Sequence, residues 1–151
     1  MSTLTKVTKG VKERPHFIGL YGPGGVGKST FAASAPNPVY LGTDDGIGTL
    51  DVASFPIPKT WSEVLSVLND LLVEEHDYAT LVIDTVNGLE PLLWNHIIKQ
   101  ARVNSIEEVD GGFGKGYLRA QEHWVEFYNT LKKLRNKMHV ILLGHAKIKS
   151  F

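Results

Sequence analysis

A glycine-rich stretch near the N-terminus carries the clearest chemical signal in this 151-residue chain. Residues 22–29 fit the phosphate-binding template G-x-x-x-x-G-K-[ST] at every fixed position, directly after the apolar run 17–21. In such loops the backbone N–H groups turn toward a polyphosphate, the lysine reaches the β- and γ-phosphates, and the serine hydroxyl ligates Mg²⁺. An ordinary glycine-rich turn has no need of Gly-Lys-Ser in that order. The residues expected to bind the nucleotide are Gly22, Pro23, Gly24, Gly25, Val26, Gly27, Lys28, Ser29 and Thr30.

Polar side chains also follow three other short apolar runs. The residues concerned are Asp44 and Asp45 after residues 39–41, Asp84 after residues 79–83, and His145 after residues 140–144. An apolar strand closed by an aspartate is typical of a Walker B strand, so Asp84 is expected to hold Mg²⁺, directly or through water. Ligands of parallel sheets bind beyond the carboxyl ends of the strands. These residues are therefore expected to share one site with the glycine loop.

Strands and helices alternate along the chain. The pattern predicts strands at about 16–21, 39–41, 79–84 and 140–145, and helices at about 28–34, 60–75, 89–102 and 117–137. Capping boxes are expected at 60–63 and 105–108, residues 47–59 are expected to be irregular, and Tyr117 is expected on the buried stripe of the last helix. This alternation predicts an α/β fold with a mainly parallel sheet and helices on both faces.

Composition and charge limit the function classes. The chain has no cysteine, which excludes disulfides, thiolate catalysis and cysteine-ligated zinc. Its apolar runs are far shorter than a bilayer-spanning helix requires, so we expect no membrane association and a cytoplasmic protein. The zero net charge is unevenly distributed: residues 1–14 carry +3, residues 44–110 carry −10 and residues 115–149 carry +6. Residues 1–14 are expected to form a flexible basic arm, and residues 15–151 one domain that is able to meet a polyanion with its basic half.

The motifs favour ATP over GTP as the nucleotide. The guanine-reading string Asn-Lys-x-Asp is missing, since 136–139 lacks the acid. Many ATPases place a catalytic glutamate directly after the Walker B aspartate, but Thr85 stands there. An acid that orients water must then come from elsewhere, and the end of the second strand supplies Asp44 and Asp45.

A second glycine cluster, residues 110–116, surrounds one aromatic and one cationic side chain. It is either an ordinary connector or a segment that holds single-stranded nucleic acid with Phe113 and Lys115. Lys147 and Lys149 follow the fourth strand. They are expected either to be solvated or to contact DNA or a neighbouring subunit's phosphate.

The sequence resembles the phage RecA-like ATPases of the single-strand-annealing recombinase group, a branch of the P-loop ATPase superfamily. The resemblance covers residues 16–149 and is carried by 22–29, 44–46, 60–61, 81–85, 112–117 and 143–147. It implies a RecA-like core with ATP and Mg²⁺ as cofactors, and action on single-stranded DNA during recombination. It also implies a homo-oligomer in the host cytoplasm, with a single-strand-binding protein as an expected partner.

The resemblance further assigns His145 as the sensor of the γ-phosphate, and Asp44 or Asp45 to the place where the family usually has glutamate. Such proteins normally continue past this histidine, so the chain is expected to be truncated after the fourth core strand. Two alternatives remain for the activity. One is a small-molecule or nucleotide kinase, and the other is a module that senses ATP without hydrolysing it and recruits a partner.

Overall fold

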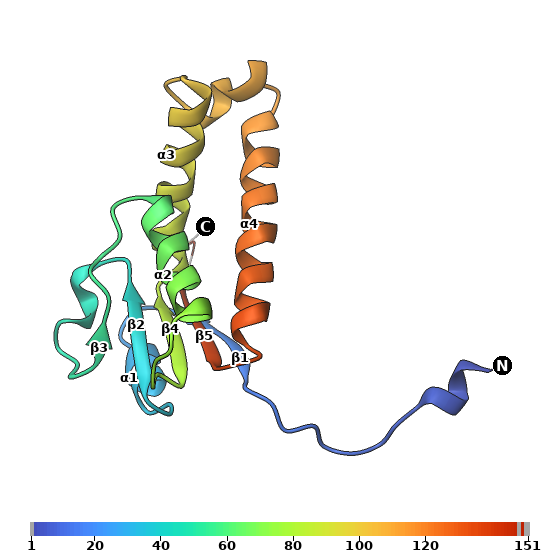
Figure 1. The fold of residues 1–151 in the computed structure, drawn as a ribbon. Helices are drawn as coiled ribbons and strands as arrows, with labels where there is room; N and C mark the ends of the chain where they lie inside the picture. The colour runs from blue at the N-terminus through green and yellow to red at the C-terminus, as the bar shows by residue number, and fades with distance from the viewer. Residues whose placement is uncertain (1, 148, 150–151) are drawn as a thin grey trace.

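Residues 2–147 and 149 are described by a computed structural model. Within them, five parallel strands form one sheet in the order β1-β5-β4-β2-β3 (Figure 1). The strands are β1 (Phe17–Gly22), β2 (Pro38–Gly42), β3 (Ala53–Ser54), β4 (Thr80–Asp84) and β5 (His139–His145). The four strands expected from the hydrophobic pattern are confirmed. The prediction that 47–59 is wholly irregular is wrong, because β3 pairs there with β2.

Four α-helices connect the strands of the described chain. They are α1 (Lys28–Ala33), α2 (Trp61–Val73), α3 (Leu89–Ala101) and α4 (Lys115–Leu134). Short 3₁₀ turns complete it, namely η1 (Thr3–Lys6), η2 (Asp45–Ile47), η3 (Val86–Gly88) and η4 (Ile106–Gly111). All four expected helices are present, and the last begins two residues earlier than the sequence suggested.

The sheet is covered unequally on its two faces. Helices α2, α3 and α4 lie on one face, where Leu81, Ile83 and Val140 join the larger core, and only α1 packs on the other (Figure 1). There Ala32 contacts a smaller cluster of sheet residues, Tyr40, Val82, Ile141 and Leu143. Coverage on both faces, as expected for this fold class, is therefore confirmed.

Helices α3 and α4 extend beyond the carboxyl ends of the strands as a helical hairpin, with η4 at its tip (Figure 1). Gly116 allows a close approach at this tip, since a Cβ on it would lie 2.1 Å from the carbonyl oxygen of Ile106. Lower down, the ring of Trp61 packs 5.5 Å from those of Trp124 and Phe127, which joins α2 to α4. Close packing thus holds η4 against α4 at the tip and joins α4 to α2 lower down.

Two local expectations at the hairpin are corrected. Ser105 makes no capping bond to the backbone; its hydroxyl instead donates to the Glu108 carboxylate at 3.3 Å. Tyr117 lies 44% exposed rather than on the buried stripe, because α4 extends past α2 at this level (Figure 1), where the Tyr117 ring packs edge-on against Trp94.

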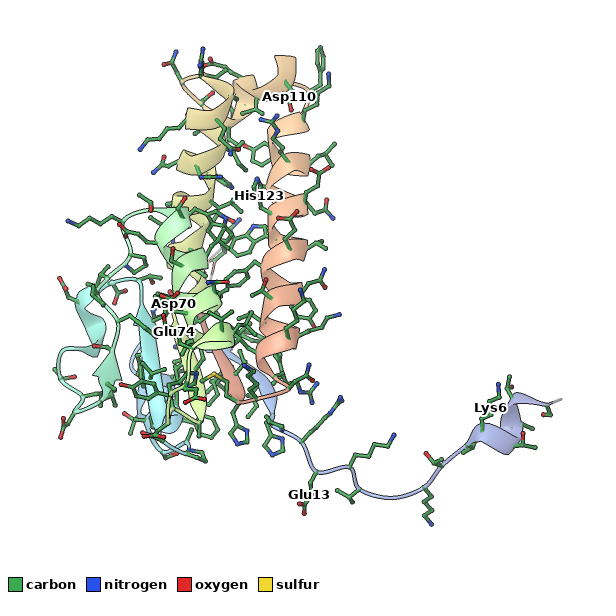
Figure 2. The ribbon with its side chains drawn as sticks, viewed as in Figure 1. Lys6, Glu13, Asp70, Glu74, Asp110 and His123 are labelled. Carbon is green, nitrogen blue, oxygen red and sulfur yellow. The ribbon has the colours of Figure 1, made fainter. Side chains whose placement is uncertain are left out.

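Residues 2–14 form an exposed arm that leaves the body beside the start of β1 (Figure 1). Figure 2 shows Lys6 and Glu13 on this arm, away from Asp70 and Glu74 at the end of α2 and from His123 on α4. Arg135 anchors its inner end by donating from Nε to the carbonyl of Pro15 at 3.0 Å. No helix in the described part of the chain is long and apolar enough to cross a lipid bilayer.

Candidate functional site

The glycine loop joins the end of β1 to the start of α1, at the carboxyl edge of the sheet. Gly27 stands at the N-cap of α1 with φ 93°, a left-handed conformation that side chains disfavour, and its carbonyl accepts the N–H of Phe31 at 2.9 Å. The loop borders a cavity of about 370 Å³. Its walls come from the ends of four strands and are formed by Gly25, Gly27, Lys28, Ser29, Thr30, Asp44, Gly46, Asp84 and His145.

Lys28 is a buried cation without an anionic partner. Its side chain is only 7% exposed, and Nζ donates to the carbonyls of Gly22 at 2.9 Å and Pro23 at 2.8 Å. Among residues 2–147 and 149 the only salt bridge joins Arg119 and Asp110, so no carboxylate neutralises this ammonium. A buried charge held by neutral acceptors alone is poorly compensated. The cavity wall is therefore suited to an anion.

Ser29 and Asp84 meet across the same cavity. The Ser29 hydroxyl donates to Oδ2 of Asp84 at 2.5 Å, which brings two oxygen ligands together beside the lysine. Within the described residues no group of three or more His, Cys, Asp or Glu side chains gathers that would suit a metal. Mg²⁺ keeps several waters and is usually held by one or two protein oxygens together with phosphates, so this pair fits it.

Tyr40, which the sequence pattern did not single out, supports the first turn of α1 from below. Its hydroxyl donates to the carbonyl of Ser29 at 2.7 Å. Burial raises the pKa of Tyr40 to about 12, and the negative charge of Asp84 contributes to the rise. The phenol therefore stays protonated and remains a donor at neutral pH. In the sequence, Tyr40 cannot be told apart from other buried strand residues. Its bond to the Ser29 carbonyl becomes evident only from the packing of β2 against α1.

The two candidate acids after β2 lie in different surroundings. Asp44 borders the cavity of the glycine loop, and its Oδ1 accepts the N–H of Gly46 at 2.8 Å. Asp45 begins η2 and borders a neighbouring cavity of about 220 Å³ beside β3. The structure thus brings Asp44, but not Asp45, to the cavity that contains Lys28.

His145 borders this cavity from the end of β5, and its backbone is held by a residue that the sequence reading missed. Asn87 accepts the His145 N–H through Oδ1 at 2.7 Å, and its Nδ2 donates to the His145 carbonyl at 3.3 Å. The next residue, Ala146, donates its N–H to the carbonyl of Gly22 at 3.0 Å. The end of β5 is thereby tied both to η3 and to the start of the glycine loop.

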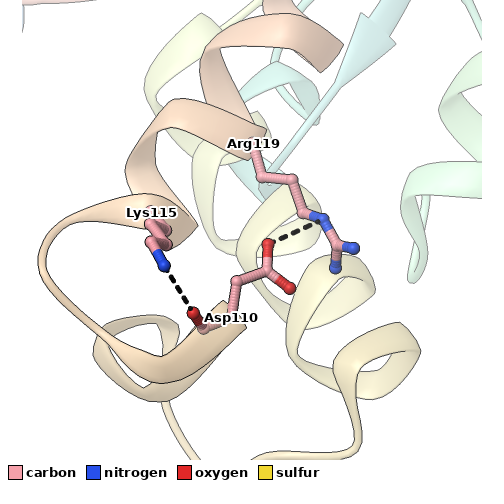
Figure 3. Close-up of polar contacts among 3 residues, drawn as sticks. All are labelled: Asp110, Lys115 and Arg119. Carbon is pink, nitrogen blue, oxygen red and sulfur yellow. Dashed lines mark hydrogen bonds and ion pairs between the residues drawn. The ribbon is translucent and has the colours of Figure 1, made fainter.

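The second glycine cluster lies at the tip of the helical hairpin and contributes nothing to the cavity wall. Residues 110–114 all have positive φ, and Phe113 within this turn is 98% exposed. Figure 3 shows how Asp110 fixes the turn: its carbonyl accepts from Lys115 Nζ at 3.2 Å, and its Oδ2 lies 3.4 Å from Arg119 Nε. The solvent-exposed ring of Phe113 therefore lies on a turn that is held in place by hydrogen bonds.

The remaining candidates follow β5. Lys147 and Lys149 are both exposed. Neither forms a salt bridge within the described residues. The structure therefore leaves their ammonium groups accessible without bringing them into the cavity wall.

The chain is similar to a protein family and to a curated protein. A family model described as "AAA domain" matches residues 14–151. The SPbeta prophage-derived uncharacterized protein YorG of Bacillus subtilis (strain 168) is 23% identical over 145 residues, which cover 93% of this chain and 43% of that protein. The chain therefore spans less than half the length of this curated relative.

Proposed function

Because this chain belongs to the AAA domain family of P-loop ATPases, we propose that it binds and hydrolyses ATP in a Mg²⁺-dependent reaction coupled to single-stranded DNA. The observation that carries the proposal is the short contact between Ser29 and Asp84 beside the buried ammonium of Lys28. Together these groups offer two oxygens for a divalent cation and one cation for a phosphate chain.

Each side chain of the cavity has a distinct task in this scheme. The Lys28 ammonium exchanges its carbonyl partners for phosphate oxygens and stabilises the charge that develops on them. Ser29 and Asp84 hold Mg²⁺, which when bound neutralises phosphate charge. Tyr40 keeps Ser29 in place through its carbonyl. The site thus acts by positioning and electrostatics, which dominate phosphoryl transfer.

Asp44 is the acid that we assign to the attacking water, in preference to Asp45, since only Asp44 borders the same cavity as Lys28. Its Oδ1 already accepts one N–H, which fixes the carboxyl group while leaving Oδ2 for water. His145 is the assigned γ-phosphate sensor. Its backbone bonds to Asn87 give a route by which nucleotide state reaches η3 and the base of the hairpin.

DNA contacts are assigned to Phe113 and Lys115 at the hairpin tip, with Lys147 and Lys149 as further phosphate contacts. A fully exposed ring on an ordered turn is suited to stacking on an unpaired base, and sequence-tolerant stacking of this kind contributes about 1–3 kcal/mol per base. The prophage origin of the Bacillus subtilis relative supports a role in phage recombination or annealing. We extend the proposal to a RecA-like homo-oligomer that works with a single-strand-binding protein.

Phosphate release, measured with and without single-stranded DNA, tests the function. DNA-stimulated release that is lost in Asp44→Asn and retained in Asp45→Asn supports the scheme, and Phe113→Ala should lower the stimulation but not the basal rate. Release that depends on a small-molecule acceptor would instead indicate a kinase. Tight ATP binding without release would indicate a sensor, an alternative favoured by the threonine that follows Asp84.

A further inference from the structure

Two basic segments of the chain adjoin at the edge of the sheet opposite the nucleotide cavity. The amino ends of the strands meet there, where the exposed N-terminal arm and the last turn of α4 come together (Figure 1). We define the basic corner as these eight side chains: Lys6, Lys9, Lys12 and Arg14 of the arm, and Lys132, Lys133, Arg135 and Lys137 at the end of α4. We propose that the basic corner binds the phosphate backbone of a nucleic acid, separately from the nucleotide site.

Hydrogen bonds fix the two halves of the corner against each other. Arg135 Nε donates to the Pro15 carbonyl at 3.0 Å, and the N–H of His16 donates to Nδ1 of His139 at 2.8 Å. The rings of these two histidines also stack, with centroids 5.4 Å apart. The base of the arm is therefore held beside the end of α4, and the arm extends that basic helix end outward, carrying Lys6 away from the body (Figure 2).

The charge of the corner is not neutralised within the chain. Its cations outnumber the arm's one acid, Glu13, and no acid occurs between residues 127 and 149. Three further acids, Glu74, Glu75 and Asp77, follow the neighbouring α2. None of these carboxylates pairs with a corner cation, since the salt bridge of Arg119 is the only one in residues 2–147 and 149.

Most of these cations also make no hydrogen bond within the described part of the protein that would account for their presence at the corner. Lys132 and Lys133 are exposed, and Lys132 Nζ lies 5.4 Å above the ring of Tyr128. Among the residues that the structure describes, only Arg135 and Lys137 of the corner donate to backbone carbonyls, those of Pro15 and Leu72. The cations near the end of α4 interact favourably with the negative end of the helix dipole. That interaction does not account for the four cations on the adjoining arm.

A polyanion with regularly spaced charges fits this arrangement better than a membrane surface. An extended basic arm beside a basic helix end can follow a phosphate chain over several nucleotides. The arm exposes only three aliphatic side chains, at Leu4, Val7 and Val11, too few for the broad apolar helix face that lies in a membrane interface. Binding at the corner should be independent of base sequence, because the group contains cations and no free aromatic platform.

Salt titration of DNA affinity tests the proposal directly. Anisotropy of a labelled dT30 strand, measured without nucleotide from 50 to 300 mM KCl, gives the slope of log K against log[KCl]. Removing two phosphate contacts should reduce that slope by about 1.4 for a single strand. We expect this reduction, with at least tenfold weaker binding at 100 mM salt, for Lys132→Ala/Lys133→Ala and for Lys9→Ala/Lys12→Ala.

The matched control is Lys59→Ala/Lys99→Ala, which removes two exposed lysines away from the corner and should leave most of the slope intact. Lys28→Ala should bind dT30 as tightly as the wild type, which separates this site from the proposed ATPase. An equal loss in the control pair, or an unchanged slope in both corner pairs, would overturn the proposal. Binding to phosphatidylglycerol vesicles but not to dT30, lost in the corner pairs, would also refute it, in favour of a membrane.

Discussion

Replacing Lys28 by methionine separates nucleotide binding from folding. The substitution keeps an unbranched apolar side chain that is one atom shorter, and it removes the charge. The ammonium gains two charge-assisted hydrogen bonds, at 2.9 and 2.8 Å, of about 1.5–3 kcal/mol each, and loses its hydration at a penalty of several kcal/mol. These opposing contributions nearly cancel. Without nucleotide, the free energy of unfolding of the variant should therefore lie within about 2 kcal/mol of the wild-type value.

The difference appears when nucleotide is added. At a concentration of ATP·Mg²⁺ one hundred times its Kd, linkage stabilises the wild type by about 2.7 kcal/mol, which for a domain of this size raises Tm by about 5–10 °C. In Lys28→Met that rise should vanish. The control Lys59→Met, at an exposed lysine, should keep it.

Differential scanning fluorimetry at several ATP concentrations, with calorimetric binding as a second readout, makes this measurement. A Lys28→Met variant that keeps a rise of several degrees would refute the assignment of this ammonium to the phosphates. A variant that is unfolded without nucleotide would show instead that the lysine is structural, and that the balance of hydrogen bonding and desolvation was wrong.

Three further changes test particular contacts. Tyr40→Phe removes the donor to the Ser29 carbonyl and should lower the free energy of unfolding by about 1 kcal/mol in urea titrations. It should also weaken Mg²⁺-dependent ATP affinity, and unchanged affinity would argue against a positioning role. Gly116→Ala places a Cβ against the Ile106 carbonyl, so circular dichroism melts should show a loss of about 1–3 kcal/mol, and a wild-type melt would contradict the packing. Burial, and then a neighbouring histidine, lower the pKa of His96, so the unfolded chain takes up this proton first as pH falls. Stability should therefore drop below about pH 6.5, and His96→Gln should reduce that drop in urea midpoints compared at pH 5.5 and 7.5.

Local patterns were sufficient to predict the elements that carry the site. The glycine loop, the Thr60 cap and the strand closed by Asp84 depend on residues close together in sequence, and the structure has each of them. The Thr60 hydroxyl accepts the Glu63 N–H at 3.2 Å, as the capping box predicts. Parallel pairing then brings the strand ends to one edge without further information from the sequence.

Contacts that depend on distant segments could not be predicted. Two examples are the hydrogen bond of Tyr40 to the Ser29 carbonyl and that of Asn87 to the backbone of His145. Each joins elements that are remote in sequence, and neither residue type indicates its partner. Strand β3 is two residues long and exposed, so it has no hydrophobic period to detect. Ser105 has the right neighbours for a cap, but burial of Ile106 and Val109 favours a 3₁₀ turn in which its hydroxyl bonds Glu108.

The position of β1 in the sheet has a consequence for the order of folding. Within the described residues, its only hydrogen-bonded neighbour is β5, and the bond of His16, just before β1, to His139 spans 123 residues. Strands β2 and β4 can pair while a nascent chain is still short, but β1 has no sheet neighbour until β5 has been synthesised. The glycine loop is encoded near the N-terminus, yet it gains its strand support last. Nucleotide binding should therefore report the pairing of β1 with β5, and a chain released before β5 should display an unsupported loop.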